Sequence, residues 1–343
     1  MIECIAPKRL KNGLLVPCGK CNLCKSKRRN EWSIRCAVEV KYCSKMPLFV
    51  TLTYNDDFVP SRWHMDCEDV DRGVINAGSS PFTLHRPDVS KFLKRFKRKY
   101  DLDDATFHYF GCGEYGDIFG RPHYHLLLFG CDFLDDVFEQ SVEKAQNILS
   151  ELWTLDGKQL GFVHVCRAGY DGIHYVSKYC LKEYDDELDE LQVKPFTIVS
   201  KNLGASWFKT TQCMHIKRQL SKLCHIDLFD IIGTISIHKD WLKWALDVLS
   251  NYVPKFEVEL DNGNIVPLPR YFRKRLVGSF QVSTDSPLFV YNEIKRLYDT
   301  ECFFEKYDGY SLGEAFALEE DKLRIKADRI TQRLLRNRKP IKK

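Results

Sequence analysis

Two histidines separated by one residue, His123 and His125, carry the most suggestive chemistry in the sequence. They precede an apolar run that ends at Gly130, and this pattern predicts a buried strand. Residues two apart on a strand point to the same face, so the two imidazoles would lie together. Imidazole pairs suit first-row metals. By itself the pair would also fit an ordinary half-buried surface pair, so its interpretation depends on the residues around it.

A carboxylate that could complete a metal site precedes the histidines. Residues 107–112 predict an aromatic-rich strand that ends at a turn containing Glu114. If this strand and the histidine strand form a hairpin, Glu114 comes next to His123 and His125. One carboxylate and two imidazoles leave coordination positions open, as a catalytic metal requires. The cofactor that we expect here is Mg2+ or Mn2+.

A doubled Tyr-x-x-Lys pattern follows downstream. Residues 172–182 predict a helix on which Tyr175 and Tyr179 lie one turn apart on the same face. Lys178 and Lys182 each stand three residues after a tyrosine. Aromatic residues at this spacing often only fill a core, but a doubled pattern after a candidate metal strand is far more specific, and these four residues are the catalytic candidates that the resemblance described below implies.

Four cysteines near the start of the chain form a second candidate metal site. Cys18, Cys21 and Cys24 have the spacing C-x2-C-x2-C, and Cys4 lies upstream. Because the chain shows no secretory signal, its 14 cysteines favour metal ligation or burial over disulfides. Four thiolates would hold one structural Zn2+. An iron–sulfur cluster fits less well, because the expected fourth cysteine followed by proline is absent, and buried thiols beside a turn remain an alternative.

Charge indicates a polyanionic partner. The net charge is +5, and basic residues gather in 1–50, 91–100 and 321–343. Such patches suit nucleic acid. A basic helix with an aromatic anchor is expected after the cysteines. The DNA-binding candidates are Arg28, Trp32, Arg35 and Arg121.

Length and composition limit the class of protein. A chain of 343 residues can hold one large domain or two moderate ones. Hydrophobic and charged fractions of 44% and 29% argue against wholesale disorder. No apolar run approaches the length of a membrane span, and the start of the chain lacks a signal-peptide pattern, so we expect a cytosolic protein.

Hydrophobic periodicity predicts the element order β-α-β-β-α-β followed by the tyrosine helix. The expected strands and helices are at 48–54, 87–100, 107–112, 121–130, 133–153 and 160–166. This order predicts an α+β fold of the ferredoxin-like, split β-α-β type, with an antiparallel sheet and helices on one face. The expected parts are a basic Cys-rich segment (1–45), a core domain (46–185) and a mostly helical region with a basic tail (186–343). Within the last part, the predicted core face of one helix is Trp241, Trp244, Ala245 and Val248.

A metal strand followed by a tyrosine helix resembles the HUH nucleases. Among them the chain resembles the rolling-circle replication initiators of microviruses, specifically the gokushovirus type. The motifs that carry this resemblance are PCGKCNLC with Arg28, Trp32, Arg35 and Glu39 after it, then FVTLTY, GCGEYG, RPHYHLLLFG, YVSKYCLK and LPRYFRKRL. They are scattered through most of residues 15–185, with a further patch near 267–276.

The resemblance implies a site-specific DNA endonuclease and strand-joining enzyme with an HUH core. It would nick the viral origin with Tyr175 or Tyr179, become linked to the 5′ end, start rolling-circle replication and recircularise the displaced strand. Its partners would be single-stranded or supercoiled origin DNA and host helicase and polymerase, in the bacterial cytoplasm. An HUH transposase or plasmid relaxase would use the same chemistry. A non-catalytic, zinc-containing DNA-binding protein would leave the His-x-His strand and the paired tyrosines unexplained.

Overall fold

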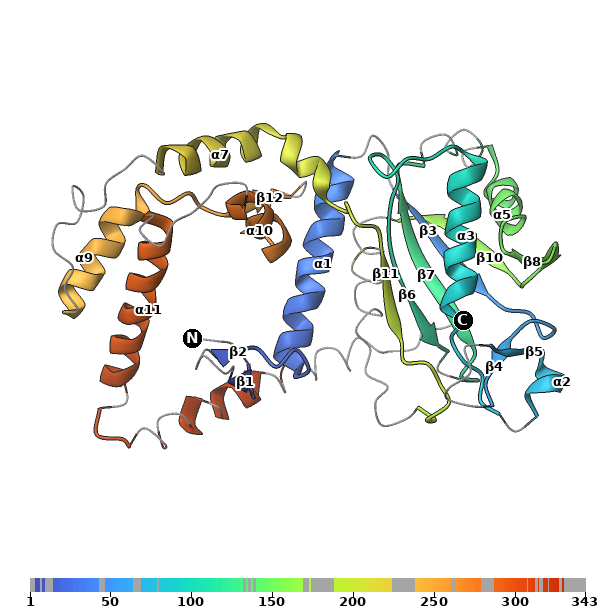
Figure 1. The fold of residues 1–343 in the computed structure, drawn as a ribbon, viewed down its shortest axis with the longest axis horizontal. Coiled ribbons are helices and arrows are strands. Elements are labelled where there is room, and N and C mark those ends of the chain that lie inside the picture. Colours follow the sequence, from blue (N-terminus) through green and yellow to red (C-terminus); the bar gives the residue numbers. More distant parts are fainter. Residues whose placement is uncertain are drawn as a thin grey trace. The chain divides into compact units, whose positions relative to one another are not determined.

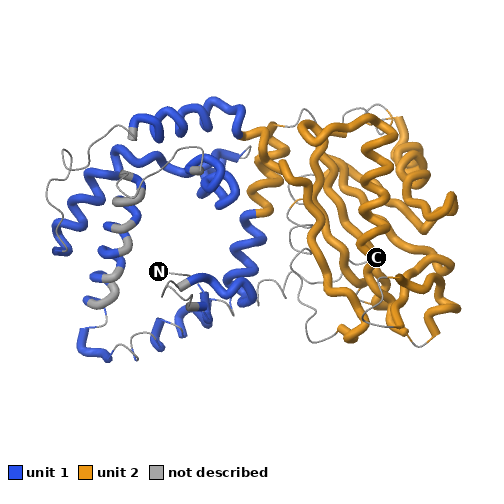
Figure 2. Tube along the Cα trace, viewed as in Figure 1, with its two compact units in different colours: residues 1–31, 208–343 blue, residues 32–207 orange. Residues whose placement is uncertain are grey.

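The computed structural model comprises two compact units, residues 32–207 and residues 1–31 together with 208–343 (Figure 2). The residues that the structure describes are 4–6, 8–9, 15–42, 47–63, 69–78, 80–116, 118–131, 134, 137, 140–168, 173, 188–223, 238–260, 263–278, 287–306, 308–311, 314, 317–319, 321–326 and 329. None of the helices in these ranges combines the length and apolar character needed to cross a membrane.

A five-stranded antiparallel sheet forms the centre of the unit 32–207 (Figure 1). The strand order is β10-β3-β7-β6-β11. The strands are β3 (Leu48–Thr53), β6 (His108–Tyr115), β7 (Pro122–Phe129), β10 (Val163–Arg167) and β11 (Phe196–Val199). The expected antiparallel sheet is confirmed, whereas the edge strand β11 was not predicted.

The order of the strands in the sheet differs from their order in the sequence. Helix α3 (Arg86–Lys99) joins β3 to β6, yet β7 lies between these two strands in the sheet. This is the split β-α-β connection that the element order predicts. The remaining short elements of the unit are β4 (Pro60–Ser61), β5 (Asp71–Arg72), α2 (Val74–Ala77), α5 (Val142–Ser150), β8 (Thr154–Leu155) and β9 (Lys158–Gln159).

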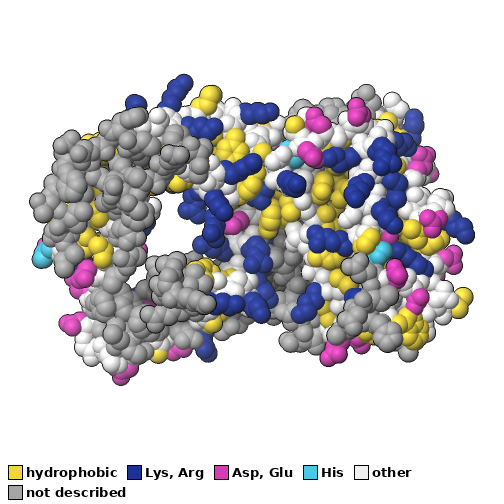
Figure 3. Space-filling model, viewed as in Figure 1, with side chains coloured by type: hydrophobic (Ala, Val, Ile, Leu, Met, Phe, Trp, Pro, Cys, Tyr) yellow, Lys and Arg dark blue, Asp and Glu magenta, His cyan; other side chains and the backbone are white. Residues whose placement is uncertain are grey.

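One face of the sheet packs against α3 and α5. Helix α3 has Pro87 in its first turn. N–H groups in the first turn have no hydrogen-bond partner within the helix, so the N–H group that proline lacks is not needed there. The buried side chains Val89, Phe92 and Phe96 of this helix follow helical spacing and belong to the hydrophobic core between α3 and this face of the sheet. Lys and Arg side chains gather over α3 on the face that Figure 3 shows. The helix is therefore amphipathic.

The opposite face of the sheet packs against the second half of α1 (Asn22–Tyr42). Cys36 and Val40 of this helix join a buried cluster with Phe110, Leu127 and Phe129. The expectation that helices cover one face only is therefore wrong. Side chains alternate along a strand, so the same strands that face α3 also present a second apolar surface that needs cover.

Polar contacts fix α1 on this face. Glu39 is 1% exposed and forms a 2.7 Å hydrogen bond with His108 Nδ1. Its other oxygen accepts from the backbone N–H of Gly204. Arg35 donates to the carbonyl of Leu203 at 3.2 and 2.8 Å. These buried contacts join α1 to β6 and to the turn after β11.

The unit formed by 1–31 and 208–343 is mostly helical. Its elements are β1 (Lys8–Arg9), β2 (Leu15–Val16), the first half of α1, α7 (Thr211–Leu223), α9 (Lys239–Ser250), β12 (Glu257–Glu259), β13 (Ile265–Pro267), α10 (Arg270–Gly278) and α11 (Pro287–Lys306). A 3-10 helix, η2 (Ala205–Lys209), spans the boundary between the two units. Strand pairs β1–β2 and β12–β13 are antiparallel.

Helix α9 packs on α11 through Leu242, Ala245 and Leu249, which contact Ile294. The predicted core face is correct for Ala245, which is buried, and for Trp241, which packs against the cluster, but it is wrong for Trp244, which is 47% exposed. The leucines and the tryptophans of α9 both recur at helical spacing, so the sequence offers two possible buried faces. Only the position of α11 shows which of the two faces is buried. The predicted face was Trp241, Trp244, Ala245 and Val248.

Candidate metal centre

Strands β6 and β7 bring the three predicted ligands together. Their register pairs Glu114 with His123 and Cys112 with His125. Directly opposed residues point to the same face, so all three ligands lie on the sheet face that carries α1. Glu114 lies inside β6 and not in the turn where it was expected, because pairing continues as far as Tyr115. The expected contact is nevertheless present.

The Glu114 carboxylate is the centre of the group. Its Oε1 lies 3.1 Å from His123 Nε2 and 3.0 Å from His125 Nε2. Two adjacent ligands about 2.1 Å from one octahedral cation would be separated by about 3.0 Å, so these spacings suit a shared metal. Glu114 is 2% exposed and His125 6%, while His123 is half-buried. The half-buried His123 leaves the group open on one side.

Hydrogen bonding on the far side of each ring supports the metal interpretation. His123 Nδ1 lies 3.2 Å from the carbonyl oxygen of Arg121, which can only accept, so Nδ1 carries the proton. The Nε2 of a neutral ring would then turn a lone pair towards the carboxylate. A cation between them removes this repulsion. Thr51 Oγ1 lies 3.1 Å from His125 Nδ1 and can accept in the same way.

One oxygen of Glu114 tests directly whether this group of residues suits a bound cation. Its Oε2 is buried and has no hydrogen-bond partner among the described residues. A buried carboxylate oxygen without a partner is costly, and a cation would satisfy it. Burial acts to raise the pKa of Glu114, but imidazoles that carry a proton on both ring nitrogens outweigh it through hydrogen bonds and charge, so the pKa lies below its ordinary value. The carboxylate is thus in the form that binds a metal.

Close strand packing positions the histidines. A Cβ atom at Gly111 would lie 2.1 Å from the carbonyl oxygen of His125, so only glycine allows β6 and β7 to approach here. Phe49 stacks on the His125 ring with centroids 5.5 Å apart. The strand position and the ring orientation of His125 are both fixed by neighbours.

The side chain between the two histidines belongs to a different network. Tyr124 is buried on the α3 face, where its hydroxyl donates to the carbonyl of His85 at 2.9 Å and lies 3.1 Å from the Tyr54 hydroxyl. Tyr54 donates to Asp88 at 2.6 Å, and Arg72 donates to both oxygens of Asp88 at 2.8 and 3.0 Å. No local pattern in the sequence predicts this network, because its members come from a strand, a loop and a helix that are far apart in the chain.

An open cleft of about 460 Å3 borders the metal centre. Its lining includes His123, Arg121, Asn55 and Phe162, and Phe162 is 70% exposed. Arg121 donates to Asp56 at 2.6 Å and to the carbonyl of Tyr54 at 3.1 Å. The cleft offers a ligand one wall of strand ends, an exposed aromatic ring and the open side of the metal centre.

The other DNA-binding candidates have different environments. Arg28 is exposed and donates to the carbonyl of Gly19 at 3.4 Å. Arg35 is 8% exposed, and its guanidinium lies 4.5 Å from the ring centroid of Trp32. Trp32 in turn stacks on Phe110. Trp32 and Arg35 therefore hold α1 on the sheet, and the DNA contacts expected of them stay predictions.

The four predicted catalytic residues lie outside the described residues: Tyr175, Lys178, Tyr179 and Lys182. Ile173, two positions before the first tyrosine, is described and 2% exposed. It packs in the cluster of Leu127 and Phe129, on the sheet face that carries the two histidines. Ile173 therefore lies on the same sheet face as the metal centre.

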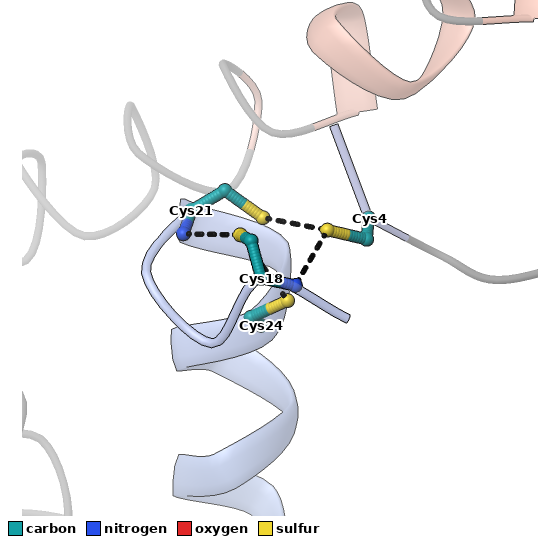
Figure 4. A group of neighbouring side chains, drawn as sticks. All are labelled: Cys4, Cys18, Cys21 and Cys24. Carbon is teal, nitrogen blue, oxygen red and sulfur yellow. Dashed lines mark hydrogen bonds between the residues drawn. The ribbon is translucent and has the colours of Figure 1, made fainter. Parts of the chain in front are cut away.

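The four N-terminal cysteines form the second cluster (Figure 4). Cys4 Sγ lies 3.9 Å from Cys21 Sγ, and Cys18 Sγ lies 4.0 Å from Cys24 Sγ. Four thiolates about 2.3 Å from a tetrahedral zinc would be separated by about 3.8 Å. The cluster therefore has the size of a zinc site.

Backbone N–H groups of this segment point at sulfur. Those of Cys21 and Lys20 donate to Cys18 Sγ at 3.3 and 3.4 Å, and that of Cys18 donates to Cys4 Sγ at 3.2 Å. Burial acts to raise the pKa of the Cys18 thiol, but the backbone donors outweigh it and lower this pKa to about 6. Such donors stabilise thiolates, the form that binds metal.

Known proteins with similar sequences are all described as replication-associated. Residues 47–184 match the family described as Replication-associated protein ORF2. The chain is 27% identical over 203 residues to Replication-associated protein ORF2 of Spiroplasma virus 4, covering 56% of this chain and 57% of that protein. It is 23% identical over 305 residues to Replication-associated protein ORF4 of Chlamydia phage 1, covering 86% and 62%.

A third relative is Replication-associated protein VP4 of Bdellovibrio phage phiMH2K, 27% identical over 177 residues, with 49% of this chain and 48% of that protein covered. The chain thus spans about half to three fifths of the length of the curated relatives it matches. No solved structure matches it. Residues 47–184 thus match the ORF2 family of replication-associated proteins, and the chain is homologous to the replication proteins of microviruses.

Proposed function

We propose that this protein is a metal-dependent HUH endonuclease that nicks single-stranded DNA at a phage replication origin and later rejoins the strand. The observation that carries the proposal is the convergence of His123 and His125 on one oxygen of the Glu114 carboxylate, whose other oxygen is buried without a hydrogen-bond partner among the described residues. The match to a replication-associated family supports the biological setting. The split β-α-β sheet supports an HUH-type core.

The three ligands would hold Mg2+ or Mn2+. Bound there, the cation would polarise the scissile phosphate and offset the negative charge that develops on it. Thr51 and the Arg121 carbonyl keep both imidazoles in the tautomer that turns Nε2 inward. The exposed Phe162 ring and Arg121 in the adjoining cleft would orient the DNA strand by stacking and by charge.

A tyrosine hydroxyl would act as the nucleophile. The phenol of Tyr175 or Tyr179 loses its proton, its oxygen bonds to phosphorus, and the bond from phosphorus to the 3′ oxygen breaks. The departing oxygen gains a proton, which leaves a free 3′-OH and a 5′-phosphotyrosine. Lys178 and Lys182 would lower the cost of deprotonating the phenol, whose ordinary pKa is about 10. The bond energy is retained, so the 3′-OH of another strand can reverse the step.

Two nucleophiles suit two linked transfers. One tyrosine would cut the origin and the other would cut at the end of a round, which releases a rejoined circle. A host helicase and polymerase would extend the free 3′-OH between these steps. The proposed location is the cytoplasm of the bacterial host.

The direct test is formation of a covalent adduct. The full chain is incubated with Mn2+ and single-stranded fragments tiled across the genome that encodes it. Adducts are separated under denaturing conditions, and the modified residue is identified by mass spectrometry. The proposal requires an adduct on one fragment, attached to Tyr175 or Tyr179. Absence of any adduct on every fragment, with metal bound, would reject it.

A further inference from the structure

A second cleft, within the unit 1–31 and 208–343, contains a concentration of positive charge. It has a volume of about 610 Å3 and is formed by the end of α9, the segment before β12, α10 and α11. Among the described residues, its lining includes four cationic side chains and no carboxylate. The four cations are Lys255, Arg270, Arg273 and Lys274.

These cations are free to bind a ligand. All four are exposed, and none has a hydrogen-bond or ion-pair partner among the described residues. By contrast, Arg275 on the same helix donates to the Tyr271 hydroxyl and lies over the Phe208 ring. Four unpaired cations around one cleft repel one another, so the site is stabilised when an anion binds.

Two aromatic rings lie in the same cleft. Phe256 and Tyr291 both line it and are half-buried, so part of each side chain faces the ligand space. Cations beside aromatic rings are the combination that binds single-stranded nucleic acid, because phosphates meet the charges and bases stack on the rings. A duplex would offer only its phosphates, since its bases remain stacked inside.

We propose that the cleft formed by Lys255, Phe256, Arg270, Arg273, Lys274 and Tyr291 is a second single-stranded DNA site, separate from the metal centre. It would hold a strand by phosphate contacts and stacking, without sequence readout and without metal. The choice of DNA as ligand rests on the proposed function. The site itself rests on the charge and rings of this cleft.

The test measures binding without cleavage. Fluorescence anisotropy follows a labelled oligothymidylate of about 20 nucleotides, with EDTA present, against the full chain and two triple variants. One variant carries Arg270→Gln, Arg273→Gln and Lys274→Gln. The matched control carries Lys209→Gln, Lys222→Gln and Lys243→Gln, three exposed lysines of the same unit that do not line the cleft. Both variants lose three positive charges.

The cleft variant should bind about tenfold more weakly, and the slope of log affinity against log salt should fall by about 2. The control variant should keep most of the affinity. Equal losses in the two variants, or none in either, would overturn the proposal, as would equal affinity for a duplex of the same length.

Photocrosslinking locates the strand in the unmodified chain, so the test stands even if a variant misfolds. An oligonucleotide carrying 5-iododeoxyuridine should crosslink to Phe256 or Tyr291. Crosslinks confined to residues 32–207 would reject the second site. Because no step requires metal or a nick, the result is independent of the adduct test for the proposed nuclease.

Discussion

At the scale of single residues, Glu114 decides whether the chain can bind its proposed cofactor. Glu114→Gln keeps the size of the side chain and removes the charge that faces two imidazoles at 3.0–3.1 Å. We expect Mn2+ binding, measured by isothermal titration calorimetry, to weaken at least tenfold, because the metal loses its one anionic ligand. His125→Ala should have the same effect.

His215→Ala is the matched control, since this exposed histidine lies on α7. It should leave Mn2+ affinity unchanged. Added Mn2+ should also raise the melting temperature of the unaltered chain and of the control, but not of Glu114→Gln. Equal Mn2+ affinity in the unaltered chain and the three variants would contradict the assignment of Glu114 and His125 as metal ligands.

Asp88 contributes to stability in a pH-dependent way. Burial acts to raise its pKa, but His85 and Arg72 hold the pKa well below its usual range by hydrogen bonds and charge. A depressed folded pKa gives stability that is present above the unfolded pKa of about 4 and lost as the pH falls below it. We expect Asp88→Asn to lower the free energy of unfolding by about 3 kcal/mol at pH 7 in urea titrations.

The difference in the free energy of unfolding between Asp88→Asn and the unaltered chain should shrink steadily as the pH falls below about 4, because the Asp88 carboxylate of the unfolded chain then becomes protonated while the native one stays ionised. Asp57→Asn changes an exposed carboxylate and serves as the control, with a difference near zero at every pH. A difference in the free energy of unfolding that stays constant between pH 7 and pH 3 would contradict the ion pair assigned to Asp88.

At the scale of elements, the sequence predicted the strands and helices that carry strong periodicity. Strands β3, β6, β7 and β10 and helix α3 were predicted within a few residues, and the hairpin placed Glu114 beside the histidines. Helix α5 was predicted at 133–153 and spans Val142–Ser150. Edge strand β11 was missed because four residues of the sequence FTIV give too short a pattern. Helix α1 covers the second face of the sheet through contacts between residues far apart in the sequence, such as Arg35 with Leu203. Local patterns in the sequence do not predict such contacts.

The predicted tyrosine helix gives a prediction of its own. Tyr175 and Tyr179 would lie roughly 6 Å apart on one helix face, so either could reach the same phosphate. We expect Tyr175→Phe and Tyr179→Phe each to form some covalent adduct but to fail in cleavage followed by joining, and the double variant to form none. Phenylalanine keeps the packing, so a loss reports on the hydroxyl.

Denaturing gels of adduct and of rejoined circular product give the two readouts. If one substitution removes all adduct and the other changes nothing, the second tyrosine is a packing residue. The enzyme would then be a one-tyrosine nickase that needs another molecule for closure.

At the scale of the whole molecule, the two metal clusters lie in different compact units and can be tested separately. The protein purified under reducing conditions should contain about one tightly held zinc, and Cys18→Ser should lose most of it. Cys302→Ser, in α11, should keep it. Metal analysis by mass spectrometry gives the zinc content.

Chelation of the zinc should loosen residues 1–45 first, which hydrogen exchange would detect as faster exchange there than in the sheet. A purified, reduced chain without zinc would instead favour buried thiols. The expected division into parts at 1–45, 46–185 and 186–343 stays a prediction at this scale.

The measurement that tests the central claim most directly is metal-dependent adduct formation by a matched set of chains. The unaltered chain, His125→Ala and His215→Ala are each incubated with Mn2+ and the reactive single-stranded fragment. We predict a covalent adduct with the unaltered chain and the control, and at least a hundredfold less with His125→Ala, while all three bind the fragment in EDTA with similar affinity. Undiminished adduct from a correctly folded His125→Ala would contradict the account.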